Sequence, residues 1–282
     1  MLALFTLPAM AWYTLFTIGP LVAVFTISFL DWRGILAPAS WTALANYERM
    51  LSDPIFWSSC VTTALHLLGT LPPLLVLSFM LGFYVSLNPP GVRFLRPVLF
   101  IPGLLSLAAQ GMVFFAVLSP NGMLNSLLSS LGLANLSTAW LANPATALPS
   151  LIAISLWGGI GYTAILFAAH LSGIDSSVYE AAELDGANRW TVMWRVAFPM
   201  TRSYFGVMAM LQFLWTLFGS AAIILLLTQG GPGLATTTLS WLIYQKAFLQ
   251  SNIGYSQAIG VVLFVVGLAG ILAIRRIFRQ SY

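Results

Sequence analysis

The sequence predicts an all-α, polytopic membrane protein with six transmembrane helices. Of the 282 residues, 59% are hydrophobic and only 6% are charged, and the mean hydropathy is +0.92. Soluble domains carry about a quarter charged residues, so this composition excludes an ordinary soluble enzyme. Six apolar runs are long enough to cross a bilayer, which takes about 20 helical residues, and none contains Asp, Glu, Lys or Arg.

The six predicted spans belong to a single transmembrane domain over residues 1–282. They are Leu4–Leu30, Thr62–Leu87, Pro97–Leu118, Leu148–Leu171, Tyr204–Thr228 and Ser256–Ile274. The first run is not followed by a small-residue cleavage site, so it is interpreted as a span and not as a signal peptide. The connecting segments are 31–61, 88–96, 119–147, 172–203 and 229–255.

The basic residues predict the orientation of these spans. With both termini in the cytoplasm, the cytoplasmic segments carry Arg93, Arg96, Arg189, Arg195, Arg202, Arg275, Arg276 and Arg279. The outer segments then carry only Arg33, Arg49 and Lys246. We therefore interpret the net charge of +4 as a topology signal and expect no nucleic-acid partner.

The longest polar segment between two apolar runs is Asp175–Pro199. The spacing of Ser177 and Glu180 predicts a capping box, with a short helix that starts at Val178. Gly186 predicts the end of that helix, because glycine can adopt the left-handed conformation that closes one.

A second short helix is expected in the same loop. Asn188 is predicted to cap it, and it is expected to run through Trp194. Pro199 marks the entry to the next apolar run. Without further information, the whole loop could equally be an amphipathic turn on the membrane surface.

The loop resembles the "EAA" loop of ABC-importer permease subunits. The resemblance is carried by Glu180-Ala181-Ala182, Asp185-Gly186-Ala187 and Phe198-Pro199. In that family the loop is a cytoplasmic coupling helix that docks into a groove on a separate ATPase subunit. The resemblance implies that ATPase coupling is carried by Tyr179, Glu180, Ala181, Ala182, Asp185, Gly186 and Ala187.

The coupling residues have different expected roles. The small side chains of Ala181 and Ala182 would allow close approach in the groove, and Tyr179 and Leu184 would supply apolar contact. Glu180 would pair with a basic residue on the ATPase, although its capping-box position explains a glutamate without any partner.

Further segments resemble sugar-type permeases, the maltose and glycerol-phosphate class. They are Ala45-Asn46-Tyr47, Asp53–Trp57, Phe100-Ile101-Pro102, Asn121–Asn125, Leu141–Pro144, Leu227–Pro232, Thr236–Leu239, Tyr244, Ala247-Phe248 and Gly254–Ala258. The resemblance implies a type I ABC importer permease fold in a bacterial or archaeal cytoplasmic (inner) membrane. The implied partners are a second homologous permease subunit, two copies of a cytoplasmic ABC ATPase, an extracytoplasmic solute-binding protein and membrane lipid.

The sequence also departs from this family pattern. A small residue is common where His170 stands, and a proline is usual where Asp175 stands. An aromatic–acidic pair often precedes the Gly-Gly-Pro loop, where this chain has Ala221-Ala222. The last departure weakens any transfer of substrate contacts from the family to the fifth span.

No catalytic or cofactor motif can be singled out. Gly230–Gly233 lacks the Lys-Ser/Thr that completes a Walker A loop, so we expect ATP and Mg²⁺ to be bound by a partner ATPase. His66 and His170 are too far apart in sequence to suggest a metal site, and each is expected to be structural. The single Cys60 excludes an intrachain disulfide. The chain is therefore predicted to be a non-catalytic subunit without a cofactor.

The uncharged spans indicate a neutral solute, because ionisable residues inside a membrane mark proton relays and ion paths. Amide and aromatic groups suit sugar hydroxyls and the apolar faces of sugars, and the candidates for the substrate pathway are Gln110, Trp157, Tyr162, Gln212 and Trp215. The last two share a helical stripe with Phe205, Met208, Gly219 and Ala222. The alternative for each of these residues is a helix–helix interface.

Two other classes of function remain compatible with the sequence. One is an ATP-independent secondary carrier, which would be expected to show buried charges and two similar halves. The other is a membrane scaffold subunit without a transport role.

Overall fold

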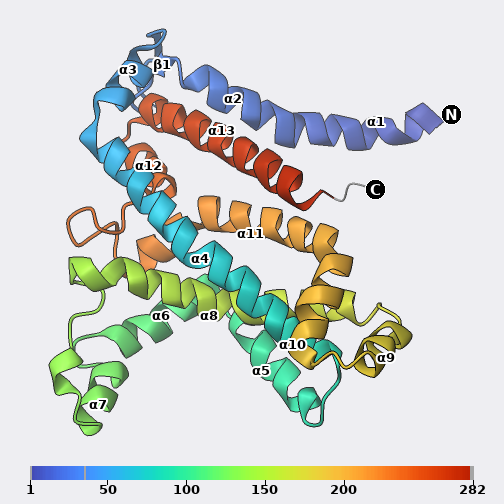
Figure 1. Cartoon of the computed structure of the whole chain (residues 1–282). Coiled ribbons are helices and arrows are strands. Elements are labelled where there is room, and N and C mark those ends of the chain that lie inside the picture. Colours follow the sequence, from blue (N-terminus) through green and yellow to red (C-terminus); the bar gives the residue numbers. More distant parts are fainter. Residues whose placement is uncertain (1, 35, 280–282) are drawn as a thin grey trace.

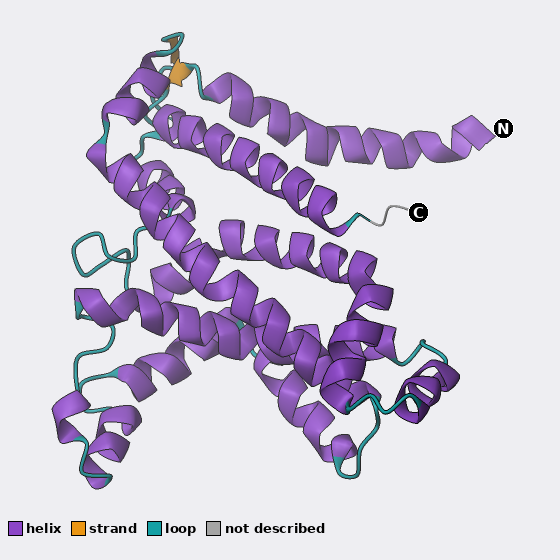
Figure 2. Cartoon of the chain, in the orientation of Figure 1, coloured by secondary structure: helices purple, strands orange, loops and turns teal. Residues whose placement is uncertain are grey.

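The chain is helical almost throughout in the computed structural model, which describes residues 2–34 and 36–279 (Figure 1, Figure 2). Within these residues, six stretches are long and apolar enough to cross a membrane. They are Thr6–Ile27, Pro54–Ser86, Leu107–Ser130, Pro144–Leu171, Arg189–Leu227 and Ile253–Phe278. The all-α fold class with six spans is therefore confirmed, although several boundaries differ from the predicted ones.

The elements follow one another with short connections. The α-helices are α1 (Leu2–Tyr13), α2 (Gly19–Ile27), α3 (Ala45–Ser52), α4 (Pro54–Ser86), α5 (Val92–Leu104), α6 (Leu107–Leu118), α7 (Met123–Ser130), α8 (Pro144–Leu171), α9 (Ser176–Leu184), α10 (Arg189–Val192), α11 (Phe198–Leu227), α12 (Leu239–Tyr244) and α13 (Ile253–Phe278). Single turns of π- or 3₁₀-helix are η1 (Thr14–Ile18), η2 (Ala134–Leu136), η3 (Met193–Ala197) and η4 (Gln245–Leu249). Two short antiparallel strands, β1 (Leu30–Asp31) and β2 (Ser40–Trp41), pair in the first long loop.

The helices α4 and α8 begin earlier than the apolar runs predicted. The carboxylate of Asp53 accepts the N–H of Ile55 at 2.8 Å, and the side-chain oxygen of Asn143 accepts the N–H of Ala145 at 3.0 Å. Each cap is followed by a proline at the first helical position, where the missing N–H costs nothing. Cap chemistry, and not hydropathy, therefore sets where these helices start.

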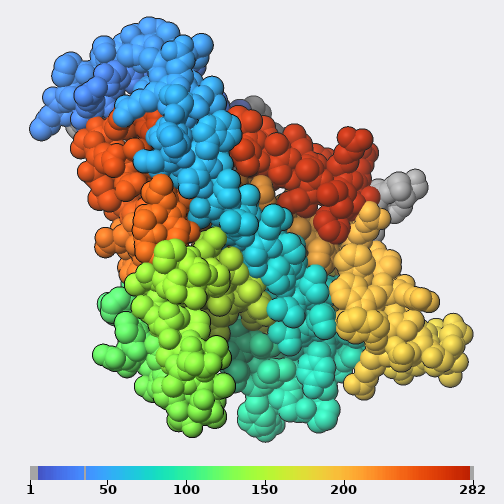
Figure 3. Space-filling model, turned by 60° about the vertical axis from the view of Figure 1, so that its left-hand side comes forward, coloured from blue at the N-terminus to red at the C-terminus, as the bar shows by residue number. Residues whose placement is uncertain are grey.

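Glycines allow α4 and α8 to pack closely. A Cβ on Gly82 would lie 2.6 Å from the Cβ of Phe167 and 2.8 Å from the carbonyl oxygen of Ala164. Nearby, the Ser78 hydroxyl donates to the carbonyl oxygen of Ile160 at 3.0 Å. The two helices thus form a joined frame, and α4 runs diagonally across the face seen in Figure 3.

The prediction of a single third span over Pro97–Leu118 is wrong. The chain forms α5 and α6, with Leu105 in an extended conformation between them. Pro102 cannot donate a backbone N–H to the helix, and the hydroxyl oxygen of Ser106 caps the next one by accepting the N–H of Ala109 at 3.2 Å. Leu105, at this break, lines the cavity described below.

The two ends of the molecule carry different loops (Figure 1). One end holds α9, α10, the N-terminal end of α1 and the C-terminal end of α13. The other end holds β1, α3, α7 and α12. The described N-terminal end of α1 and C-terminal end of α13 therefore lie at the same end of the molecule as the Asp175–Pro199 loop.

Candidate functional site

The loop helix α9 begins at Ser176, so the predicted start at Val178 with a capping box is wrong. The Asp175 carboxylate accepts the N–H of Ser177 at 2.9 Å, and this hydrogen bond lowers the pKa of Asp175. Aspartate and serine cap about equally well, and a cap at Asp175 lets two more residues join the helix. Glu180 consequently does not hold a capping-box position.

The predicted end of α9 is confirmed, and so is the second cap. Gly186 has a φ of +81°, and the N–H of Ala187 donates to the carbonyl oxygen of Ala182 at 3.0 Å. The side-chain oxygen of Asn188 then accepts the N–H of Thr191 at 2.9 Å. These two signals were readable from the sequence because each depends only on neighbouring residues.

The second loop helix does not stop at Trp194 as predicted. It continues through the π-helical turn η3 into α11, so that Arg189–Leu227 is one helical stretch. Pro199 has no N–H for the carbonyl four residues earlier, and the N–H of Phe198 donates instead to Met193, five residues earlier. The loop is thereby continuous with the fifth span.

Helix α9 has an inward and an outward face. Tyr179 and Ala182, three residues apart, pack against an apolar cluster that includes Phe83 of α4. Burial there raises the pKa of the Tyr179 phenol. Glu180 and Leu184 point outward, and Leu184 is 89% exposed. Tyr179 therefore faces the permease itself, which differs from the contact with an ATPase expected from the sequence.

The seven candidate coupling residues divide between these two faces. The partly buried ones are Tyr179, Ala182 and Ala187, and the exposed ones are Glu180, Ala181, Asp185 and Gly186. Residue type alone could not separate the two sets, because small and apolar residues occur on both sides of the helix.

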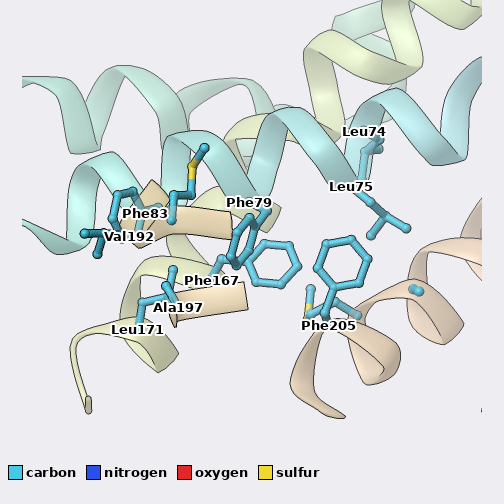
Figure 4. Packing of buried hydrophobic residues seen from close by; sticks show 12 residues of the cluster. Leu74, Leu75, Phe79, Phe83, Phe167, Leu171, Val192, Ala197 and Phe205 are labelled. Atoms are coloured by element: carbon cyan, nitrogen blue, oxygen red, sulfur yellow. The ribbon is translucent and has the colours of Figure 1, made fainter. Parts of the chain in front are cut away.

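The inward face of α9 adjoins an aromatic cluster that joins four elements (Figure 4). The Phe79 ring of α4 has its centroid 5.5 Å from Phe167 of α8, 5.8 Å from Phe205 of α11 and 5.6 Å from Trp194 of η3. Aromatic ring pairs at these distances add to the free energy gained from burial. The cluster therefore ties the loop to the spans.

A cavity of about 710 Å³ lies among α4, α8, α11 and the break between α5 and α6. Four of the five candidate pathway residues line it, namely Gln110, Tyr162, Gln212 and Trp215. The fifth, Trp157, does not line the cavity, because its ring packs edge-on against Phe114 with centroids 5.1 Å apart. The fifth-span stripe also divides, since Phe205 lies in the aromatic cluster whereas Met208, Gly219 and Ala222 line the cavity.

Both glutamines in the cavity wall also join helices. The Gln212 amide donates to the hydroxyl oxygen of Thr163 at 2.8 Å and so links α11 to α8. The Gln110 amide donates to the carbonyl oxygens of Pro102 and Leu105, each at 3.1 Å, and so bridges the break between α5 and α6. The interface role that the sequence left open is thus real for both, and both still line the cavity.

Two cavity residues were missed in the sequence-based prediction. His66 and Thr70 of α4 line the cavity, although His66 was expected to be a structural histidine. The signal was present, because two polar residues four apart in an apolar run lie on one helix face. The lining residues include no Asp, Glu, Lys or Arg. Within the described part of the chain, no group of three or more His, Cys, Asp or Glu side chains could hold a metal ion.

This fold and loop are those expected of a membrane-embedded permease subunit of an ABC importer. Residues 74–281 match the family model described as "Binding-protein-dependent transport system inner membrane component". The match spans more than half of the chain, and the protein belongs to this family.

Curated relatives and solved structures agree with this assignment. The chain is 31% identical to a probable ABC transporter permease protein, YurN of Bacillus subtilis, over 99% of this chain and 96% of that protein. It is 30% identical to the diacetylchitobiose uptake system permease protein NgcF of Streptomyces coelicolor, over 92% of this chain and 76% of that protein. A crystal structure of a bacterial ABC transporter for alginate import has the same fold, with a TM-score of 0.86 at 21% identity over 99% of this chain and 94% of that one.

Family membership fixes several functional points. The chain is a multi-pass inner-membrane subunit of a transporter that depends on a solute-binding protein. It is not an enzyme and carries no cofactor, and ATP is bound by a separate ATPase subunit of the complex. The carrier and scaffold alternatives are therefore set aside.

Proposed function

We propose that this subunit forms half of the translocation pathway of an importer for an uncharged sugar or oligosaccharide. The cavity lining carries this proposal, because it combines amides, hydroxyls and aromatic rings with no Asp, Glu, Lys or Arg. Amides suit sugar hydroxyls, and the rings of Tyr162 and Trp215 suit the apolar faces of sugars. A charged solute would favour a residue of opposite charge in the wall.

The names of relatives support a sugar. Besides the diacetylchitobiose permease, the chain is 28% identical to the lactose transport system permease protein LacF of Rhizobium radiobacter. It is 31% identical to the multiple sugar-binding transport system permease protein MsmF of Streptococcus mutans. The names of these relatives give different sugars. They therefore support a sugar as the class of solute for this chain, but they do not indicate one particular sugar.

The proposed complex contains a second, homologous permease subunit and two copies of the ATPase. Trp215 lines the cavity yet is 70% exposed, and its neighbour Leu211 is exposed too. A second permease subunit that covers this side of α11 would complete the pathway. A solute-binding protein would deliver the solute to the end that holds α3, α7 and α12.

The outward face of α9 is proposed as the ATPase contact, in the cytoplasm together with both termini. Leu184 exposes a large apolar side chain there, as docking residues do, and Glu180 is exposed four residues earlier on the same helix. Trp190 of the following helix α10 is also exposed. The bias of arginines towards this end supports the orientation.

Purification of the assembled complex in mild detergent tests the proposal. Identification of the subunits by mass should give an ABC ATPase and a second six-span permease. The complex, reconstituted in liposomes with its binding protein, should take up a neutral sugar such as lactose, maltose or diacetylchitobiose in an ATP-dependent manner. Uptake by this chain alone, or uptake only of an acidic oligosaccharide, would contradict it.

A further inference from the structure

Two residues in the α4 wall of the cavity each carry a buried polar atom without a partner among the described residues. The Nε2 atom of His66 and the hydroxyl of Thr70 are buried, and the two residues are 3% and 1% exposed. Neither atom has a hydrogen-bond partner among residues 2–34 and 36–279. Buried polar atoms are nearly always paired, so two unpaired ones in a single helix turn require an explanation.

Other hydroxyl residues of α4 show the usual solution. Thr62 donates to the carbonyl oxygen of Ser58 at 3.1 Å, and Thr63 donates to that of Ser59 at 2.7 Å, each four residues earlier. Thr70 could reach the carbonyl of His66 by the same rule, but its hydroxyl makes no such bond. The hydroxyl of Thr70 is therefore left without the usual backbone partner and has no other among the described residues.

The position of the pair suggests what that group is. His66 and Thr70 are four residues apart on one face of α4, and both line the cavity. The imidazole offers a donor and an acceptor, and the hydroxyl offers both. The same cavity is lined by the amide of Gln212 and by the rings of Tyr162 and Trp215. This set matches a solute that presents several hydroxyl groups and no charge.

We propose that His66 and Thr70 form a hydrogen-bonding site for the hydroxyl groups of the transported solute. This site deepens the proposed function and rests on it. Solute hydroxyl groups at this site would pair both atoms. The solute would thereby be held against α4, the helix that also contacts the loop helix α9.

Matched threonine variants test this site in the complete reconstituted complex. Thr70→Val removes an unpaired hydroxyl in the cavity wall, and Thr62→Val removes a similarly buried hydroxyl, 7% exposed, that is already paired with the backbone. The probe is whichever of lactose, maltose and diacetylchitobiose the wild-type complex takes up best. We expect Thr70→Val and His66→Leu to lower the amount of sugar moved per ATP by about threefold to tenfold. Thr62→Val should stay within about twofold of wild type, and His66→Gln should recover part of the loss.

Thiol labelling provides a direct readout of occupancy. The native Cys60 is first replaced by serine, and Thr70→Cys is compared with Thr62→Cys by mass after treatment with a small thiol reagent. Sugar should protect the cysteine at position 70 and leave the rate of labelling at position 62 unchanged.

The outcomes separate the two proposals. Equal sugar-per-ATP ratios for Thr70→Val and Thr62→Val, or no protection at position 70, in a complex that transports sugar would overturn the α4 site alone. A wild-type complex that takes up none of the neutral sugars would overturn the proposed function and the α4 site with it.

Discussion

The rings of Tyr179 and Phe83 meet edge-on, with their centroids 6.2 Å apart and their planes at 78°. Tyr179 belongs to the loop helix α9, and Phe83 belongs to the span α4. Both adjoin the cluster that contains Leu74, and Leu74 also lines the cavity. A continuous set of packed side chains therefore leads from the loop to the cavity wall.

Truncation of the Tyr179 side chain should weaken the coupling of ATP hydrolysis to uptake without detaching the ATPase. Tyr179→Ala removes a ring that faces the permease, so we expect ATP-driven uptake to fall about 2- to 30-fold while the ATPase still co-purifies. Leu184→Ala is the matched variant, because Leu184 lies on the outward face of the same helix, and it should lower ATPase recovery instead. Uptake per ATP and ATPase recovery are measured on both variants. Loss of the ATPase in Tyr179→Ala would place that ring at the partner interface.

Position 186, which ends α9, should tolerate only residues that accept a positive φ. Gly186 has a φ of +81°. Apart from its chain neighbours, no atom of the described residues lies within 4 Å of the place where a Cβ would stand. A larger side chain at this position would therefore strain the backbone without a steric clash. Gly186→Val should uncouple ATP hydrolysis from uptake, because a β-branched residue is least tolerant of this conformation, while membrane insertion persists. Gly186→Asn should retain most uptake, since asparagine visits this region more readily. Wild-type uptake by the valine variant would count against the coupling role of this turn.

Removal of the Glu180 carboxylate should affect assembly and not helix stability. Asp175 caps α9 through Ser177, and Glu180 is exposed, so the capping role that could have explained it is absent. Glu180→Gln and Glu180→Ala should both weaken ATPase binding, most clearly at low ionic strength, because an exposed ion pair is screened by salt. Binding is measured by titration of the detergent-purified permease with the ATPase at two salt concentrations. If both variants bind as wild type does at each salt concentration, Glu180 has no ionic partner.

Local signals in the sequence predicted much of this fold. Apolar run length gave six spans, and Gly186 and Asn188 marked a helix end and a helix start correctly. The errors lie where a distant or competing contact decides. Asp175 and Ser177 were both acceptable caps, and the break at Leu105 lies between Pro102 and the cap residue Ser106, which a search for apolar runs does not register.

The candidate sites were less predictable because they depend on which face of a helix is covered. Tyr179 and Leu184 look alike as apolar residues of one short helix, but only the fold shows that the first packs inward. Trp157 has the chemistry of a sugar contact, but its ring packs edge-on against Phe114 and does not line the cavity. The spacing of His66 and Thr70 shows only that they share a helix face. The lack of a partner for the His66 Nε2 atom among the described residues is visible only in the structure.

The contact between α5 and α8 should be highly sensitive to a single added methyl group. A Cβ on Gly161 would overlap the carbonyl oxygen of Leu99, and a backbone atom cannot move aside as a side chain can. Gly161→Ala should therefore push α5 away from α8 beside Tyr162 in the cavity wall. Overpacking of this kind costs about 1–3 kcal/mol, which corresponds to a melting midpoint lower by roughly 5 °C.

Gly260→Ala is the matched control for this substitution. A Cβ on Gly260, also within a span, would meet only ordinary contacts, 3.7 Å from the Gln257 side-chain oxygen and 3.8 Å from Val24. Alanine favours a helix over glycine equally at both positions, so the difference between the variants isolates the contact with Leu99. Thermal unfolding of the purified complex and sugar uptake are measured on both. Equal midpoints and equal uptake would mean that α5 yields without cost and does not fix the cavity wall.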